Sequence, residues 1–212
     1  MFSKVEDFVN KHNQIITIIT SALVIIVGGY YAYINLYLAP ISQEAESQIF
    51  KAEQYFGMDS FDLALNGDGN NYGFIDIIDE YGGTKSAELA NYYAGMCYLN
   101  KSEHENAIEY LSNFSTTDEM LQALAWAGIG DANMELDNKE EAINYYEKAA
   151  YHIDNEFLSP ILLQKVGLAN EENNNNEAAL KAYKTIKEKY AESNEGREIE
   201  KYIARIEASN NN

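Results

Sequence analysis

A fixed spacing of small residues recurs three times in the second half of the chain, and it limits the fold more than any other feature. A glycine is followed twelve residues later by an alanine in three places: Gly95 and Ala107, Gly130 and Ala142, Gly167 and Ala179. Glycine costs a helix interior about 1 kcal/mol relative to alanine, so its recurrence indicates a packing requirement. Small residues at a constant separation let two helix backbones approach closely. The spacing therefore predicts stacked pairs of helices and an all-α fold.

The most complete unit covers residues 123–150. Gly130 lies on its first helix, residues 136–139 supply a polar turn, and Ala142 and Tyr146 lie one turn apart on its second helix. The glycines are 35 and 37 residues apart, close to the period of about 34 of the tetratricopeptide repeat. The pattern resembles that repeat over 85–192 and implies three tetratricopeptide repeats, stacked as an α-solenoid.

An uncharged and mostly apolar segment, 14–38, precedes the repeats. About 20 such residues suffice for a helix to cross a bilayer, and the tyrosines clustered at the end of the segment are typical of a membrane interface. We therefore predict a single transmembrane anchor at 14–38, after an amphipathic lead at 1–13. A cleaved signal peptide is disfavoured by the length of the segment and by the absence of a clean small-x-small site. A buried core helix is the other alternative.

Charges on either side of the anchor predict its orientation. Lys4 and Lys11 precede it, whereas Glu44 and Glu46 are the first charged residues after it. The positive side of a single span faces the cytoplasm. The expected location is thus the bacterial inner membrane, with a cytoplasmic N-terminus and a periplasmic repeat domain. A cytoplasmic repeat domain would favour several basic residues after the anchor, where Lys51 stands alone.

The remaining segments are expected to complete the array at both ends. Residues 42–84 read as a degenerate first repeat with an inserted loop at 61–74, and Gly73 precedes Ala107 by 34 residues, which assigns the helix at 72–81 to its second half. Asn66, Asp68 and Asn70 alternate as in a calcium loop, but the required glycine and glutamate are missing, so a structural loop is favoured. Residues 193–212 are expected to form a capping helix and a tail at 210–212.

Composition excludes several classes of function. The formal charge of −19 disfavours nucleic acid and anionic lipid as partners. The single cysteine, Cys97, excludes an internal disulfide and reads as a buried apolar residue. The three histidines have no partners at catalytic or metal-ligand spacing. We therefore expect no enzymatic activity, no catalytic residues, no cofactor, no metal and no small-molecule substrate.

Curved repeat arrays bind partners in the trough lined by the first helices of their units. Ten residues adjacent to the core positions are the candidates for this partner-binding groove: Tyr92, Met96, Leu99, Leu124, Asp131, Met134, Glu135, Gln164, Leu168 and Glu171. Exposed Tyr, Met and Leu side chains there favour an apolar protein surface as the ligand. Packing between repeats is the alternative role for each of them.

The whole layout resembles the YfgM family, ancillary subunits of the bacterial Sec translocon, in its Bacteroidetes form. The local matches are VEDFVNKHN (5–13), GGYYAYINLY (28–37), AEQYF (52–56), LALNGDGN (63–70) and YYAGMCYL (92–99). The resemblance implies a non-enzymatic protein that binds a PpiD-like membrane-anchored chaperone through the trough, beside the SecY-containing translocon, and assists protein export. The alternatives are a periplasmic scaffold for outer-membrane assembly or cell division, and a cytoplasmic adaptor with inverted topology.

Overall fold

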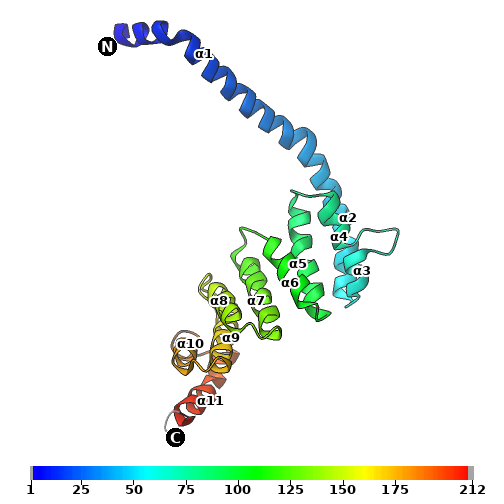
Figure 1. Ribbon diagram of the computed structural model, residues 1–212, viewed down its shortest axis with the longest axis vertical. Coiled ribbons are helices and arrows are strands. Elements are labelled where there is room, and N and C mark those ends of the chain that lie inside the picture. The colour runs from blue at the N-terminus through cyan, green and yellow to red at the C-terminus, as the bar shows by residue number, and fades with distance from the viewer. Residues whose placement is uncertain (1, 210–212) are drawn as a thin grey trace.

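The computed structural model describes the backbone of residues 2–209 and the side chains of 11–208. Throughout that part the secondary structure is helical and contains no strand. A long N-terminal helix leads into a curved stack of shorter antiparallel helices, with the C-terminal helix at the far end (Figure 1). The predicted all-α architecture, an apolar N-terminal helix followed by a repeat array and a cap, is confirmed.

The N-terminal helix is continuous from the anchor into the array. α1 (Phe2–Ala32) passes through a π-helical turn, η1 (Tyr33–Leu38), into α2 (Ala39–Gly57). The helix over Lys11–Gly57 has a mean hydropathy of 2.1 in its apolar window, no part of which is buried, so it could span a membrane. The π-helical turn immediately precedes Pro40, which cannot make the regular backbone hydrogen bond.

Three antiparallel helix pairs follow, in the register that the sequence predicts. They are α5 (Lys85–Asn100) with α6 (His104–Asn113), α7 (Glu119–Glu135) with α8 (Lys139–Ala150), and α9 (Leu158–Glu172) with α10 (Asn176–Lys189). Each pair is joined by three residues whose middle one is left-handed: Ser102, Asp137 and Asn174, with φ of 59° to 60°. A left-handed residue ends the first helix and reverses the chain at once.

The predicted close approach within each pair is present. A Cβ built on Gly130 would lie 2.5 Å from the ring of Tyr146, and one built on Gly167 would lie 2.1 Å from the ring of Tyr183. Ala142, on the facing helix, is 0% exposed. The glycines are thus required by the aromatic or aliphatic side chain that packs against their backbone.

The first repeat departs from the sequence-based prediction. Its second helix begins as α3 (Phe61–Asn66), stops at a loop, and resumes as α4 (Phe74–Glu80). The turn before α3 has the same left-handed residue, Asp59, with φ 54°, and the buried Ala64 follows it by five residues, as Ala107 follows Ser102. The predicted loop at 61–74 is therefore wrong over 61–66. Ala64, not Gly73, occupies the position that Ala107 holds on the second helix of the next repeat. The glycines and asparagines of 67–73 concealed the apolar face of α3.

The loop at 67–73 is organised by the carboxylate of Asp68. It accepts hydrogen bonds from the hydroxyl of Tyr55 at 2.7 Å and from the backbone N–H groups of Asn70 and Asn71 at 2.9 and 2.8 Å. These hydrogen bonds hold the pKa of Asp68 well below its usual value, and the one from Tyr55 contributes most. The carboxylate thus closes the loop on itself.

The last helix, α11 (Asn194–Ser209), covers the end of the stack. Ile199, Ile203 and Ile206 are 0%, 6% and 2% exposed, and Arg205 binds Glu171 of α9 with Nη2 at 2.7 Å. The expected tail at 210–212 and the amphipathic side chains expected at 2–10 lie outside the described residues.

Candidate partner-binding trough

The first helices of the three pairs succeed one another along the array, because α5 contacts α7 and α7 contacts α9. The ten predicted groove residues lie on these helices, and eight of them lie at positions that recur between repeats. Met96, Asp131 and Leu168 each follow the packed glycine by one residue, and Leu99, Met134 and Glu171 follow it by four. These positions share one face of each first helix, and a partner-binding trough along that face stays a prediction.

Five of the predicted residues meet at a single hollow of about 500 Å³ between α5 and α7. We call it the turn-end hollow, because it lies beside the turns that join each first helix to its second. Its lining consists of Met96, Leu99, Asn100, Ser102, His104, Asp131, Met134, Glu135 and Tyr146. Met96, Leu99 and Met134 supply an adaptable apolar part of this lining, and the lining as a whole is more polar than apolar.

His104, the first residue of α6, was assigned no role from the sequence. Its Nδ1 is buried, and it is the one buried side-chain nitrogen or oxygen without a hydrogen-bond partner among the described side chains. A buried polar atom left unpaired costs about 1–3 kcal/mol. The sequence feature that could have indicated His104 is its position just after the turn that follows the predicted groove residue Leu99.

The other predicted residues divide between exposed and packed positions. Leu124 and Leu168 are 37% and 38% exposed, and Gln164 is half-buried. The ring of Tyr92 lies 5.4 Å from that of Phe114, within an apolar cluster of the interior. Tyr92 is half-buried and packs against Phe114, and a groove role for it stays a prediction.

Two predicted groove carboxylates join their repeat to the element that stacks on it. Asp131 accepts hydrogen bonds from the hydroxyl of Tyr146 at 2.7 Å and from Nζ of Lys165 at 2.5 Å. Glu171 accepts them from the hydroxyl of Tyr183 at 2.6 Å and from Arg205. Each basic partner lies 34 residues later: Lys165 on the next repeat and Arg205 on the capping helix α11. These carboxylates stabilise the array and leave fewer oxygen atoms for a ligand.

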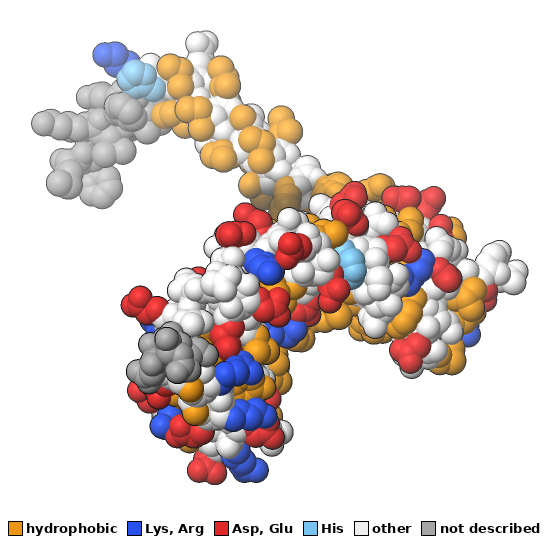
Figure 2. Space-filling view, turned by 60° about the horizontal axis from the view of Figure 1, so that its bottom comes forward, with side chains coloured by type: hydrophobic (Ala, Val, Ile, Leu, Met, Phe, Trp, Pro, Cys, Tyr) orange, Lys and Arg blue, Asp and Glu red, His pale blue; other side chains and the backbone are white. Residues whose placement is uncertain are grey.

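The surface of the array is acidic. The single cysteine of the chain, Cys97, is buried in the core. Acidic side chains are spread over the array, whereas apolar ones cover the projecting N-terminal helix (Figure 2). Cys97 is 0% exposed, and burial raises the pKa of its thiol to about 12. A thiol with that pKa remains protonated at neutral pH and is a poor nucleophile.

Comparison with known proteins identifies the repeats directly. Two tetratricopeptide repeat family models match, at 123–151 and at 162–193. The chain therefore carries tetratricopeptide repeats, which define a class of protein–protein interaction scaffold, and no catalytic family is indicated.

Among solved structures, the crystal structure of MamA is similar, with 20% identity and a TM-score of 0.44 over 65% of this chain and 89% of that chain. No curated protein matches the sequence.

Proposed function

We propose that this chain is a non-enzymatic, membrane-anchored scaffold that serves as an ancillary subunit of the bacterial Sec translocon. Its N-terminus lies in the cytoplasm and its repeats lie in the periplasm. There it binds a PpiD-like membrane-anchored chaperone beside the SecY-containing translocon and assists protein export. The layout of a short lead, one apolar helix and an acidic repeat array supports this proposal.

The turn-end hollow is the observation that supports binding most strongly. It combines apolar side chains from Met96, Leu99 and Met134 with polar ones such as Asn100 and Ser102. Such a surface suits an apolar side chain that is held beside a hydrogen-bonding backbone or side-chain group. A segment of folded or extended polypeptide offers both.

The test adds bulk and charge at two lining residues of the hollow. Asn100 and Glu135 line the hollow and are exposed, so Asn100→Arg with Glu135→Arg adds bulk and positive charge. The matched control is Glu109→Arg with Asn113→Arg on α6, which are exposed, lie outside the hollow and change the net charge equally. Both variants should unfold at the wild-type temperature.

Affinity purification in mild detergent from native membranes gives the readout. We expect the control to recover the PpiD-like chaperone and SecY at wild-type levels and the hollow variant to recover about tenfold less, as for about 1.4 kcal/mol of lost binding. Equal recovery by both variants would exclude the hollow as the binding site. Recovery of outer-membrane assembly or cell-division proteins in place of SecY would assign the chain to another envelope complex.

A further inference from the structure

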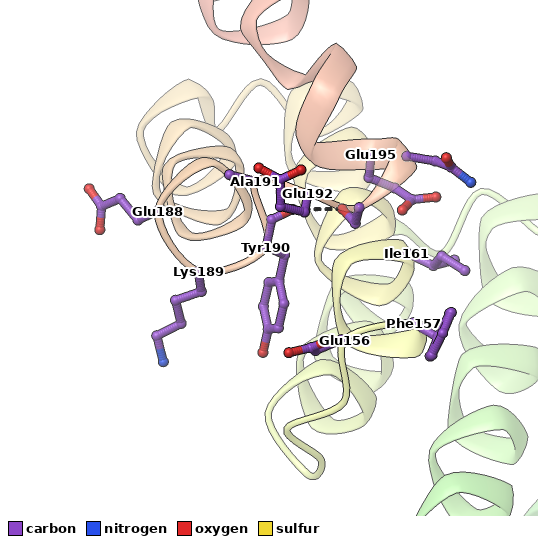
Figure 3. Close-up of a pocket in the computed structure, with 11 residues that line it drawn as sticks. Glu156, Phe157, Ile161, Glu188, Lys189, Tyr190, Ala191, Glu192 and Glu195 are labelled. Carbon is purple, nitrogen blue, oxygen red and sulfur yellow. Dashed lines mark hydrogen bonds between the residues drawn. The ribbon is translucent and has the colours of Figure 1, made fainter.

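A second apolar site lies where α9 begins, at the other end of the first helices from the turn-end hollow. Phe157, just before α9, is 83% exposed, more than any other large apolar side chain among the described residues. Ile161, one turn later, is 41% exposed. Both line a pocket of about 590 Å³ against the turn that joins α10 to α11 (Figure 3). We call it the start-end pocket.

The wall opposite Phe157 is held in place by internal bonds. The hydroxyl of Tyr190 donates to Asp154 at 2.6 Å, which ties this turn to the one before α9. The hydroxyl of Ser193 donates to the carbonyl of Tyr190 at 2.8 Å and accepts from the N–H of Gly196 at 2.9 Å. A Cβ built on Gly196 would lie 2.1 Å from the Tyr190 carbonyl oxygen. The pocket is therefore preformed, and a ligand would not need to order it.

Carboxylates line the same pocket as these two apolar side chains. Glu156, Glu188, Glu192 and Glu195 line the pocket together with a single cation, Lys189. Figure 3 shows Glu192 and Glu195 on the α10–α11 side and Phe157 and Ile161 on the α9 side. Within the described part of the chain, none of these four glutamates takes part in an ion pair. A bound cation would gain from several unpaired carboxylates at once.

We propose that the start-end pocket binds a segment of a partner protein in which an apolar or aromatic residue is flanked by lysine or arginine. The apolar side chain packs on Phe157 and Ile161, and the flanking cations face the glutamates. An acidic segment would be repelled by the same glutamates. This contact is separate from the turn-end hollow and gives the scaffold a second binding site of defined charge.

The experiment uses the full-length chain in non-ionic detergent and a fluorescent nine-residue peptide. The peptide has one phenylalanine between paired lysines in a glycine–serine background. A second peptide carries glutamates in place of the lysines, and empty micelles provide the blank. Anisotropy titrations should show binding of the lysine peptide that weakens with added salt, and no binding of the glutamate peptide. Equal binding of the two peptides would overturn the proposal.

Variants locate the contact. Phe157→Ser should weaken lysine-peptide binding about tenfold, as expected for losing most of a buried aromatic contact, with no change in unfolding temperature because the side chain is exposed. Phe50→Ser, at a position 61% exposed on α2, should bind as wild type. Glu192→Gln with Glu195→Gln should weaken binding about fivefold and flatten its salt dependence. Wild-type binding by Phe157→Ser would contradict the proposal.

A further variant separates this site from the proposed function. The chain with Asn100→Arg and Glu135→Arg should bind the lysine peptide as wild type does, since those residues lie outside the start-end pocket. Loss of peptide binding in that variant would show that the peptide occupies the turn-end hollow, and the start-end pocket would be excluded.

Discussion

Individual glycines hold the helix pairs together by making room for one large side chain. The clearest case is Gly167, whose neighbour Tyr183 is 0% exposed and carries a hydroxyl bound to Glu171 at 2.6 Å. Because the ring is enclosed and anchored at its far end, it has little freedom to move away from an added methyl group. The contact therefore depends on glycine at this position.

Gly167→Ala should lower the free energy of unfolding by about 1–3 kcal/mol, the usual cost of overpacking. Urea unfolding of the full-length chain in detergent measures it. The control is Gly57→Ala at the end of α2, where a Cβ meets nothing within 4 Å, and where stability should stay constant or rise slightly. A similar loss in both variants would mean that the Tyr183 contact is not the cause.

The buried thiol of Cys97 makes stability depend on alkaline pH. Burial raises its pKa from an ordinary value of 9.0 to about 12, so between these values the unfolded chain loses a proton that the folded chain keeps. Its contribution to stability is complete below about pH 9 and falls as the pH rises toward about 12. We expect the unfolding temperature to fall over this range, and to fall less steeply in Cys97→Ala. An unchanged slope in Cys97→Ala would contradict this assignment.

At the level of elements, the sequence predicted the three later repeats because their small residues and polar turns recur at a constant separation. Within the first repeat it misplaced the start of the second helix, because the loop at 67–73 interrupts that helix. Ala64 does follow Ala52 by twelve residues. Because the first of these two residues is alanine, and not glycine as in the later repeats, the spacing is hard to recognise. Alanine is common in helices for its propensity alone, so it signals close packing less clearly than glycine does.

The candidate trough could be predicted only in part. Positions such as Met96 and Met134 follow from the repeat, since their distance from the packed glycine is fixed. The roles of His104 and Phe157 could not be predicted, because burial of the first and exposure of the second depend on neighbouring elements. Likewise, the pairing of Asp131 with Lys165 depends on how one repeat stacks on the next.

The loop at 67–73 should depend on Asp68 while the array does not. Asp68→Ala removes the acceptor for the N–H groups of Asn70 and Asn71, so hydrogen exchange at both amides should accelerate markedly. The unfolding temperature should change little, since the loop is exposed. Asp79→Ala, at an exposed position on α4, is the control and should leave both amides protected. Unchanged exchange in Asp68→Ala would show that the backbone alone holds the loop.

At the level of the whole molecule, one continuous helical segment provides both the apolar N-terminal part and the first helix of the array. The helix that could span a membrane continues into α2, whose Ala45, Ile49 and Ala52 are buried in the first repeat. The helix runs without a loop from the apolar segment into the array. In the proposed setting, this keeps the trough close to the membrane and lowers the ordering cost when a membrane partner binds.

Site-specific photo-crosslinking in living cells tests the central claim most directly. A photoreactive amino acid replaces Leu99 in the turn-end hollow or, as the control, the exposed Glu109 of α6, and the crosslinked proteins are identified by mass spectrometry. We expect position 99 to capture the periplasmic part of a PpiD-like chaperone or SecY, and position 109 to capture neither. Equal capture from both positions, or capture of cytoplasmic proteins from position 99, would contradict a periplasmic trough that binds a partner of the translocon.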